Sequence, residues 1–488
     1  MALRLRDELE LQAASDGSGG TLLDPLFTRT VTLGPTGVAV ARKLDGTREP
    51  PRLIAELVEA GFVRATIEDS LRCLTLLQLI DGIGDGVRDR VRAIWAGEIE
   101  LEPRTLPDTR FACQGSGMCC RSYRLGPITA DEVASISALP LRASFADLPD
   151  GELFVRHDDK QYLRRVDSGC VFLQPDERCG LHARFGEAAK PSACRSYPVA
   201  AKLTFEAAVL YNNQQCASHF VSQDRGPALI ESAHLIRTRL SGPLTLFHPI
   251  VFVREDTPVD YAHFLVLEGA LRQVVADGAP FRQLAYALEI CDSFVAAART
   301  FPLGSDPAVA FAAWRASIAI AADPPPPPSP ADWDAALAAL ELVVDELASF
   351  LANVEHADPG DRDMAPLIVE LLPGLELLRE RARERPSSTP ALPVDIAAAL
   401  RTSLVQGFQG QLSLPEDRPL AAIGQAALAI AAGFAGAQRT GGGWGIAELG
   451  RGHALANRVL PPFTSPMFRQ HPERARGLVA ALAALCGS

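Results

Sequence analysis

The chain is short of positive charge, with 47 lysines and arginines against 59 aspartates and glutamates and a formal net charge of −12. Because phosphate binding needs clustered lysine and arginine, we expect no nucleic-acid partner. Residues 1–20 are charged and lack the apolar core of a signal peptide. The longest uncharged Ala-rich run, residues 421–437, contains Gln425 and favours a buried helix over a membrane span. These absences predict a cytoplasmic protein without a membrane partner.

Several familiar motifs are also missing. The sequence has no nucleophile elbow and no H-E-x-x-H motif. Its clustered cysteines form neither the C-x2-C knuckles of zinc ribbons nor the C-x2-C-x2-C-x3-C run of bacterial ferredoxins. The C-x3-C-x2-C signature of radical S-adenosylmethionine enzymes is absent as well. A metal centre in this chain must therefore be built from a different arrangement of cysteines.

The glycine-rich stretch LIDGIGDG, residues 79–86, resembles the first motif of Rossmann-type S-adenosylmethionine (SAM) methyltransferases. That motif needs a preceding strand, whereas the residues before this stretch have the apolar spacing of a helix. We therefore interpret the glycines as a turn that ends a helix. If the chain uses SAM, this turn is the second place to look, after the cysteine-rich region.

The character of the sequence changes twice and divides the chain into three regions. Residues 22–100 combine an extended β-branched segment, a turn and two helical patterns, which predicts a winged-helix-like unit. Residues 101–222 hold short apolar runs, many turns and most of the cysteines, and predict an irregular metal-binding domain. Residues 223–488 are rich in Ala and Leu and predict a large α-helical region, with a stiff Pro-rich linker at 323–332. The expected fold class is α+β, mainly α-helical.

The third region is expected to contain nine helices. They are predicted over residues 226–241, 259–277, 281–300, 306–322, 331–354, 362–384, 394–407, 419–438 and 473–485. The first region also resembles the peptide-binding PqqD-type modules that accompany peptide-modifying enzymes. That resemblance implies a protein or peptide as a partner.

The cysteines are the strongest signal in the chain. Seven of the ten lie between residues 113 and 216, where an even scatter would place about two. Thiolates must converge on a metal at about 2.3 Å, so close pairs on tight turns suit such a site. Glycines stand where these turns need them, at Gly115, Gly117, Gly169 and Gly180. We expect the metal ligands to be Cys113, Cys119, Cys120, Cys170, Cys179, Cys194 and Cys216.

Other interpretations of these residues remain open. The thiols could be buried small hydrophobes, or disulfides, although a reducing compartment and an odd count disfavour disulfides. Cys119 and Cys120 are neighbours, and in an extended segment they would point to opposite sides. We therefore expect one of them to bind a second iron or to stay a free thiol. His182 and His219, each three residues after a cysteine, are further candidate ligands or else packed or solvent-exposed imidazoles.

The cysteine spacing resembles the YkgJ-type cysteine-cluster family, a zinc- or iron-chelating domain related to flagellin lysine N-methylases. The resemblance is carried by CQGSGMCC at residues 113–120, CGLH at 179–182 and KPSACRSYP at 190–198, and it spans about 110 residues. It implies that the seven cysteines hold an iron–sulfur cluster, with 4Fe–4S as the expected type, or else zinc or iron. One position departs from the pattern, because Ser116 stands where the family often has another cysteine.

Three functions follow as hypotheses. The first is a metalloprotein whose central domain binds the cluster or metal through thiolates. The second, implied by the family relation, is a SAM-dependent protein-lysine N-methyltransferase. The third is a metal storage or delivery protein without catalysis.

Overall fold

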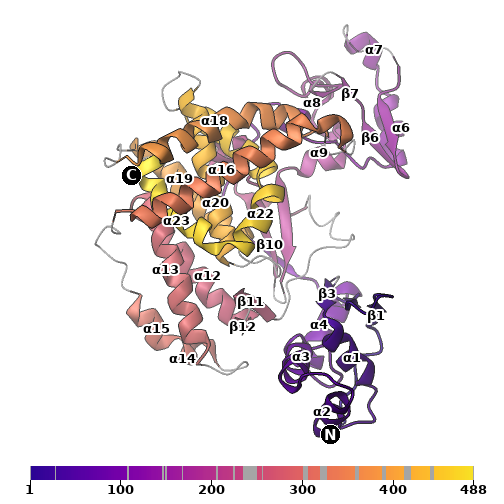
Figure 1. Ribbon diagram of the computed structural model, residues 1–488. Helices are drawn as coiled ribbons and strands as arrows, with labels where there is room; N and C mark the ends of the chain where they lie inside the picture. Colours follow the sequence, from indigo (N-terminus) through magenta and orange to yellow (C-terminus); the bar gives the residue numbers. More distant parts are fainter. Residues whose placement is uncertain are drawn as a thin grey trace.

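In the computed structural model, helices dominate and the sheets are small (Figure 1), which confirms the expected α+β, mainly α-helical class. The structure describes residues 2–486, with the exception of 28, 107–108, 146–147, 149–150, 167–168, 205–206, 224–225, 235–249, 255–256, 301–305, 319–326, 358–361, 387–391, 412–418 and 440–444. Part of the predicted Pro-rich linker, residues 323–326, and part of the predicted helix 226–241 lie outside the described residues.

The N-terminal unit combines a three-stranded antiparallel sheet with four helices. Its strands are ordered β1-β2-β3, and sequence analysis missed the first of them because it lies before residue 22. The elements are β1 (Glu10–Ala13), β2 (Gly20–Asp24), β3 (Arg29–Leu33), α1 (Pro35–Lys43), α2 (Pro50–Glu59), α3 (Arg64–Leu76) and α4 (Asp85–Trp95). Leu22 and Leu33 from the sheet and Leu53 and Ile67 from the helices are buried in one core.

The glycine-rich stretch at residues 79–86 lies between two helices. α3 ends at Leu76, and α4 begins directly after Gly84. Gly84 has a φ of +73°, and a Cβ at this position would lie 2.3 Å from the Gln78 side chain. The glycines do not end α3, so that prediction was wrong: the left-handed residue that follows α3 is Gln78, with a φ of +56°, and Gly84 directly precedes α4. The stretch lacks the preceding strand of a SAM-binding motif.

The central region consists of short elements around a mixed sheet. In this sheet β4 (Glu102–Arg104) runs parallel to β10 (Ala207–Asn212), which pairs antiparallel with β9 (Val199–Leu203). The other elements are α5 (Met118–Ser122), α6 (Ala130–Ser137), α7 (Leu141–Ser144), β5 (Phe154–His157), β6 (Lys160–Leu163), β7 (Arg165–Val166), β8 (Gly169–Cys170), α8 (Gly180–Phe185), α9 (Ser192–Ser196) and α10 (Ser218–Ser222). The β4–β10 pairing brings together the beginning and the end of the central region, which lie about 100 residues apart in the sequence.

The C-terminal region is a bundle of longer helices. It begins with the hairpin β11 (Ile250–Arg254) and β12 (Thr257–Asp260), which the sequence did not predict. The helices are α12 (Tyr261–Ala276), α13 (Pro280–Ala298), α14 (Pro307–Ala310), α15 (Ala312–Ser317), α16 (Pro330–Ala352), α18 (Ala365–Glu384), α19 (Val394–Gln411), α20 (Pro419–Arg439), α21 (Ile446–Val459), α22 (Pro461–Gln470) and α23 (Pro472–Cys486). The described part of the predicted helix 306–322 is broken into α14 and α15, and residues 319–322 lie outside the described residues.

Sequence analysis also missed α21, and the reason is glycine. Gly450 and Gly452 lower the helix propensity of this segment. In the structure they permit close packing: a Cβ on Gly452 would lie 2.7 Å from the carbonyl oxygen of Gly433 on α20. The two helices therefore pack with their backbones nearly in contact, and tertiary packing offsets the low propensity.

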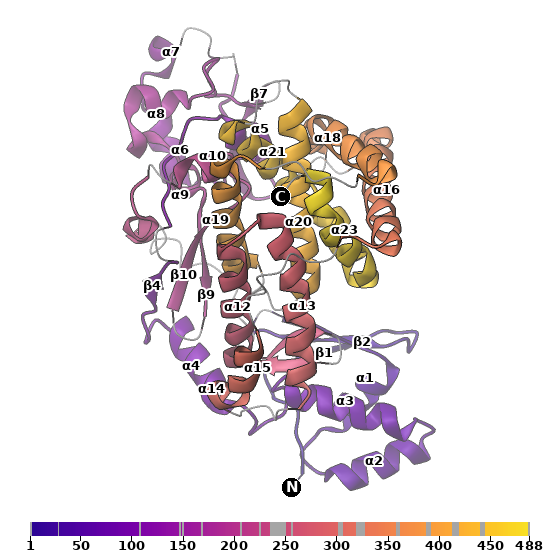
Figure 2. The ribbon, with the colours of Figure 1, turned by 90° about the vertical axis from the view of Figure 1, so that its left-hand side faces the viewer.

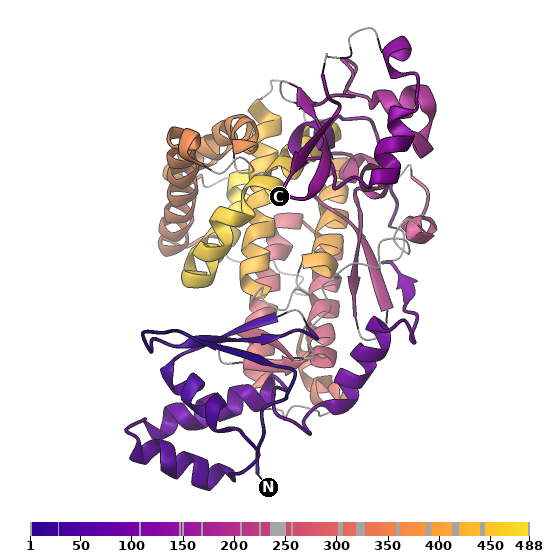
Figure 3. The same ribbon diagram turned by 90° about the vertical axis from the view of Figure 1, so that its right-hand side faces the viewer.

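The N-terminal unit and the helical bundle both contact the sheet of the central region. Phe27 and Val91 from the N-terminal unit pack with Leu101, Leu203 and Ala208 from the central region. α19 lies alongside β10 (Figure 2), and α10 packs against α19 and α21. The N-terminal unit lies at the lower end of the molecule and much of the central region lies at the upper end (Figure 3). Among the described residues, no helix is long and apolar enough to cross a membrane.

Candidate metal centre

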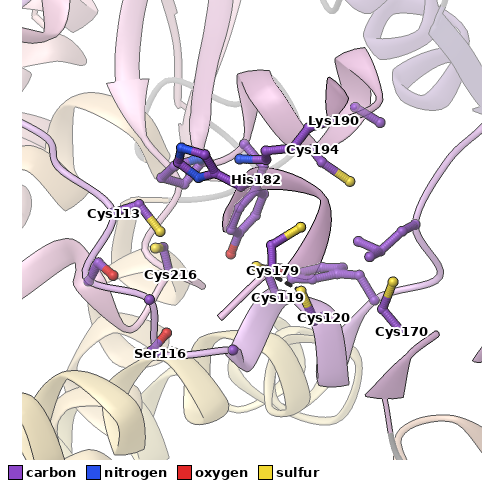
Figure 4. A pocket seen from close by; sticks show the side chains of 18 of the residues that line it. Cys113, Ser116, Cys119, Cys120, Cys170, Cys179, His182, Lys190, Cys194 and Cys216 are labelled. Atoms are coloured by element: carbon purple, nitrogen blue, oxygen red, sulfur yellow. Dashed lines mark hydrogen bonds between the residues drawn. The ribbon is translucent and has the colours of Figure 1, made fainter. Parts of the chain in front are cut away.

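The predicted cysteines line one cavity of about 750 Å³ in the central region (Figure 4). Cys113 lies in the loop before α5, and Cys216 lies in the loop before α10. Between them come two cysteines on α5 and one each on β8, at the start of α8 and on α9. The cavity is thus lined by Cys113, Cys119, Cys120, Cys170, Cys179, Cys194 and Cys216.

Two glycines shape the turn that leads into α5. Gly115 and Gly117 have φ values of +69° and +64°, in the left-handed region that favours glycine. Gly117 is also the residue directly before the helix, and a Cβ there would lie 2.4 Å from Glu177 Oε2. Both positions confirm that the glycines between the first cysteines serve a tight turn.

The other two predicted glycines allow close side-chain packing. A Cβ on Gly180 would lie 2.4 Å from the ring of Phe145, and one on Gly169 would lie 2.8 Å from the side chain of Leu173. Neither has a positive φ. These glycines bring the cysteine-bearing segments β8 and α8 close to the core of the region.

Cys119 and Cys120 do not point to opposite sides, so that expectation was wrong. It assumed an extended segment, but both residues lie in the helical turn α5. Their Sγ atoms are 4.0 Å apart, and both thiols line the cavity. The helical turn rotates successive side chains by far less than a strand does, which allows neighbours to share a site.

An ion pair connects two cysteine-bearing segments. Arg121 on α5 donates from Nη2 to Glu177 Oε1 at 2.5 Å and from Nε to Oε2 at 3.1 Å. Glu177 lies two residues before Cys179 and has a φ of +68°. Arg165 of β7 donates to the backbone oxygen of Arg121 at 2.6 Å. These contacts fix α5 relative to the loop that carries Cys179.

Burial keeps several of the thiols protonated at neutral pH. It raises the pKa of Cys170 and of Cys216 to about 12, and it raises the pKa of Cys194 as well. The hydrogen bond between Cys119 and Cys120 lowers the pKa of Cys119, with a further contribution from the charge of Lys190. The same hydrogen bond raises the pKa of Cys120. A metal bound here would displace protons from the buried thiols.

The thiols form two groups within the cavity. Figure 4 shows Cys113 and Cys216 together, on the side away from Cys170 and Cys194. Cys119 influences both groups, because its negative charge raises the pKa of Cys194 and that of Cys216. Ser116 lines the same cavity.

The thiols share a cavity without converging on one point. Within the described part of the chain, no three His, Cys, Asp or Glu side chains are grouped so that they could hold a metal ion. A bound metal would therefore have to draw the sulfur atoms closer together than they lie. Metal binding by these cysteines stays a prediction.

The two candidate histidines lie in different surroundings. His182 on α8 is exposed and lines the cavity. His219 on α10 is 0% exposed, and its Nε2 lies 3.2 Å from Ser403 Oγ on α19. Burial lowers the pKa of His219 to about 4, and its ring stacks with that of His453 on α21 at 6.4 Å. His219 thus belongs to the contact with the helical bundle.

Sequence analysis missed two tyrosines that line the cavity. The ring centroids of Tyr123 and Tyr197 are 5.2 Å apart. The Tyr123 hydroxyl donates to Gln215 Oε1, and burial raises its pKa to about 12. The guanidinium of Arg458 on α21 lies 5.1 Å from the Tyr123 ring centroid. The tyrosines therefore connect the cavity wall to the helical bundle.

The sequence contains a signal for these tyrosines. The tetrapeptide C-R-S-Y occurs twice, at residues 120–123 and 194–197. Each copy places its cysteine on a five-residue helix, and its tyrosine directly follows that helix. A search for short repeats around the cysteines would have found both tyrosines.

Comparisons of the chain with protein-family models, with curated proteins and with solved structures found no match. The resemblance to the YkgJ-type cysteine-cluster family therefore rests on the cysteine motifs alone and remains a prediction.

Proposed function

We propose that the central region binds an iron–sulfur cluster, or iron or zinc, through its cysteine thiolates. The observation that carries this proposal is the cavity, which is lined by seven cysteines from six separate segments of the chain. Core cysteines that serve only as small hydrophobes have no reason to gather in this way. Thiolate sulfur is also the donor that iron–sulfur clusters, iron and zinc accept in proteins.

The donor set fits such a centre in its chemistry. Cys119, Cys120, Cys170, Cys179 and Cys194 would hold the cluster or metal, because they lie close enough for the ionisation of one thiol to raise the pKa of others in this set. Cys113 and Cys216 would complete it or hold a second ion on their side of the cavity. When bound, a cluster would supply electron transfer, whereas zinc would supply structure or Lewis acidity.

The protein's own residues would prepare the site in two ways. The Arg121–Glu177 ion pair holds α5 against the Cys179 loop, so that these thiols stay near one another. The aromatic rings of Tyr123 and Tyr197 cover one wall and limit the access of water. Limited access protects a reduced cluster or a thiolate from oxidation.

Metal and acid-labile sulfide analysis of anaerobically purified, full-length protein tests this proposal. Iron with matching sulfide would support a cluster, and stoichiometric zinc without sulfide would support a zinc site. A protein that holds no iron, zinc or sulfide after purification and after anaerobic reconstitution would overturn the proposal.

The size of the cavity favours a second candidate function. A volume of about 750 Å³ lies in the range of small-molecule sites and greatly exceeds the space that one metal ion fills. The second candidate is a SAM-dependent protein-lysine N-methyltransferase, in which a winged-helix-like, PqqD-like N-terminal unit binds the protein substrate. Calorimetry tests it: anaerobic protein should bind SAM and should lose this binding in Cys194→Ser. A protein that binds metal but no SAM would instead support metal storage or delivery.

A further inference from the structure

Lys190 is a half-buried cation in the wall of the cysteine cavity. Its backbone position is fixed, because Arg195 donates from Nη1 to the Lys190 oxygen at 2.7 Å and to the Ala188 oxygen at 2.9 Å. Figure 4 shows Lys190 and His182 on the same side of the cavity, with Ser116 on the opposite side. The Lys190 amino group therefore belongs to the upper part of the site in this view.

The other charged groups of the cavity wall have partners. Glu177, the one acid among the described lining residues, is held by Arg121 through two hydrogen bonds. Arg124 lies 3.8 Å from Asp363, and Arg178 lies 4.0 Å from Asp176. The charges of these lining residues are therefore already balanced within the protein.

The Lys190 amino group has no such hydrogen-bonded partner, although its charge favours the thiolate forms of Cys119 and Cys194. Within the described part of the chain, no hydrogen bond or ion pair joins its Nζ to another residue. Burying an ammonium group without a partner costs free energy, so an ammonium in a cavity wall normally faces an anion. The Cys119 thiolate offers one such charge, and a cavity of about 750 Å³ also has room for an anionic small molecule.

We propose that Lys190, with His182 on the same side of the cavity, forms a subsite for the carboxylate or phosphate group of a small molecule that occupies the cavity beside the thiols. Two nitrogen donors on one side of a cavity suit an oxyanion, because each can donate to a separate oxygen. The ligand would be a co-substrate or substrate of the centre. The inference deepens the proposed function by naming its ligand class, and it rests on that function only for the metal that shares the cavity.

Anion binding to full-length, anaerobically purified protein tests the subsite. Inorganic phosphate and acetate are the two probes, and each is titrated by calorimetry at low ionic strength into metal-reconstituted and metal-free protein. The variants are Lys190→Gln, which removes the charge, and Lys190→Arg, which keeps it. Lys160→Gln is the matched control, because Lys160 is exposed on β6 and does not line the cavity.

We expect the wild type to bind at least one probe, and the stronger one identifies the oxyanion. Lys190→Gln should weaken that binding by about tenfold or more, which is the effect of losing one charged hydrogen bond. Lys190→Arg should keep the affinity within about threefold, and Lys160→Gln should leave it unchanged.

Two results would overturn the proposal. The first is that neither probe binds the wild type. The second is that Lys190→Gln binds both probes as the wild type does; a lowered metal content in that variant would then mark Lys190 as a counter-charge for the thiolates. Metal analysis of the same wild-type sample separates the two hypotheses, since Lys190-dependent anion binding in a protein that takes up no metal supports the subsite and contradicts the metal centre.

Discussion

Buried thiols occur in two regions of this protein, and the difference between them is informative. In the helical bundle, Cys291 on α13 and Cys486 on α23 are buried, and burial raises the pKa of each to about 12. In the cavity, burial raises the pKa of Cys170 and Cys216 to the same value. A raised pKa therefore does not distinguish a candidate ligand from a core residue. What distinguishes a candidate ligand is that the sulfur atoms of several other cysteines line the same cavity.

The two regions are also stabilised in different ways. The bundle consists of long helices, such as the 23-residue α16, which begins with Ser329 and Asp332 capping each other. In the cavity region, α5 and α9 have five residues each, too few to be stable alone. Glycine turns and the Arg121–Glu177 pair hold α5 in place. Losing one contact should therefore disturb the cavity more than the bundle.

The largest expected effect comes from removing thiols that line the cavity, compared with removing a thiol from the bundle. Cys170→Ala and Cys194→Ala should each lower metal retention by about tenfold or more, because a ligand is lost. Cys291→Ala removes a thiol that is about as buried as that of Cys170 and should leave metal retention unchanged. The measurement is metal bound per chain after anaerobic reconstitution. Equal retention by all three variants would show that the cavity thiols are ordinary core residues.

Acid should loosen the contact between the two regions. Burial lowers the pKa of His219 to about 4 and that of His453 to about 3, from an unfolded value of 6.5. Between those values the unfolded chain binds protons that the folded chain does not, so stability is lost as the pH falls below 6.5. The loss should be roughly 1.4 kcal/mol per pH unit for each histidine.

Urea unfolding at a series of pH values between 7 and 4.5 measures this loss. His219→Gln removes one titrating group and should make the dependence on pH less steep over this range. The same slope in the wild type and in the variant would show that His219 is not held neutral in the folded protein.

Within the bundle, two neighbouring glycines of α20 should respond in opposite directions to the same substitution. A Cβ on Gly433 would lie 2.5 Å from the backbone nitrogen of His453, whereas a Cβ on Gly436 would meet nothing within 4 Å. Gly433→Ala should therefore destabilise the protein by about 1–3 kcal/mol. Gly436→Ala should stabilise it by up to about 1 kcal/mol, because alanine favours the helix. Free energies of unfolding from urea titration distinguish these outcomes, and similar values for the two variants would argue against close α20–α21 packing.

Breaking the Arg121–Glu177 pair should have a smaller effect on stability. Both side chains are about one-third exposed, so Glu177→Gln should cost only about 1 kcal/mol of unfolding free energy. Because the pair positions the Cys179 loop, metal retention should fall by several-fold as well. Asp159→Asn breaks the exposed Arg156–Asp159 pair on the β5–β6 turn and serves as the control. An equal metal content in both variants would show that the Arg121–Glu177 pair has no role in the centre.

The smallest effect is expected at Ser116. A hydroxyl is a poor ligand for soft metals, so Ser116→Cys should raise the metal affinity by a factor on the order of three. Ser116→Ala is the control and should behave as the wild type. A chelator competition assay measures the affinities, and an unchanged value for Ser116→Cys would show that this position does not face the metal.

Local sequence signals predicted much of the secondary structure of this protein. The Ala- and Leu-rich periodicity located eight of the helices in the bundle, although 306–322 is broken in two. The glycines between Cys113 and Cys119 marked a tight turn, and LIDGIGDG marked a turn between two helices. Each of these features depends on the conformational preferences of neighbouring residues, which the sequence states directly.

Only the tertiary structure decided which residues meet. Cys179 and His182 have the same spacing as Cys216 and His219, so the sequence treats the two histidines alike. His182 is exposed on α8 at the cavity, whereas α10 packs against α19 and α21 and buries His219 against Ser403. The same holds for α21, whose glycines predict poor helix formation but fit the backbone of α20. Spacing is local, whereas burial depends on segments far away in the chain, and it is burial that separates these cases.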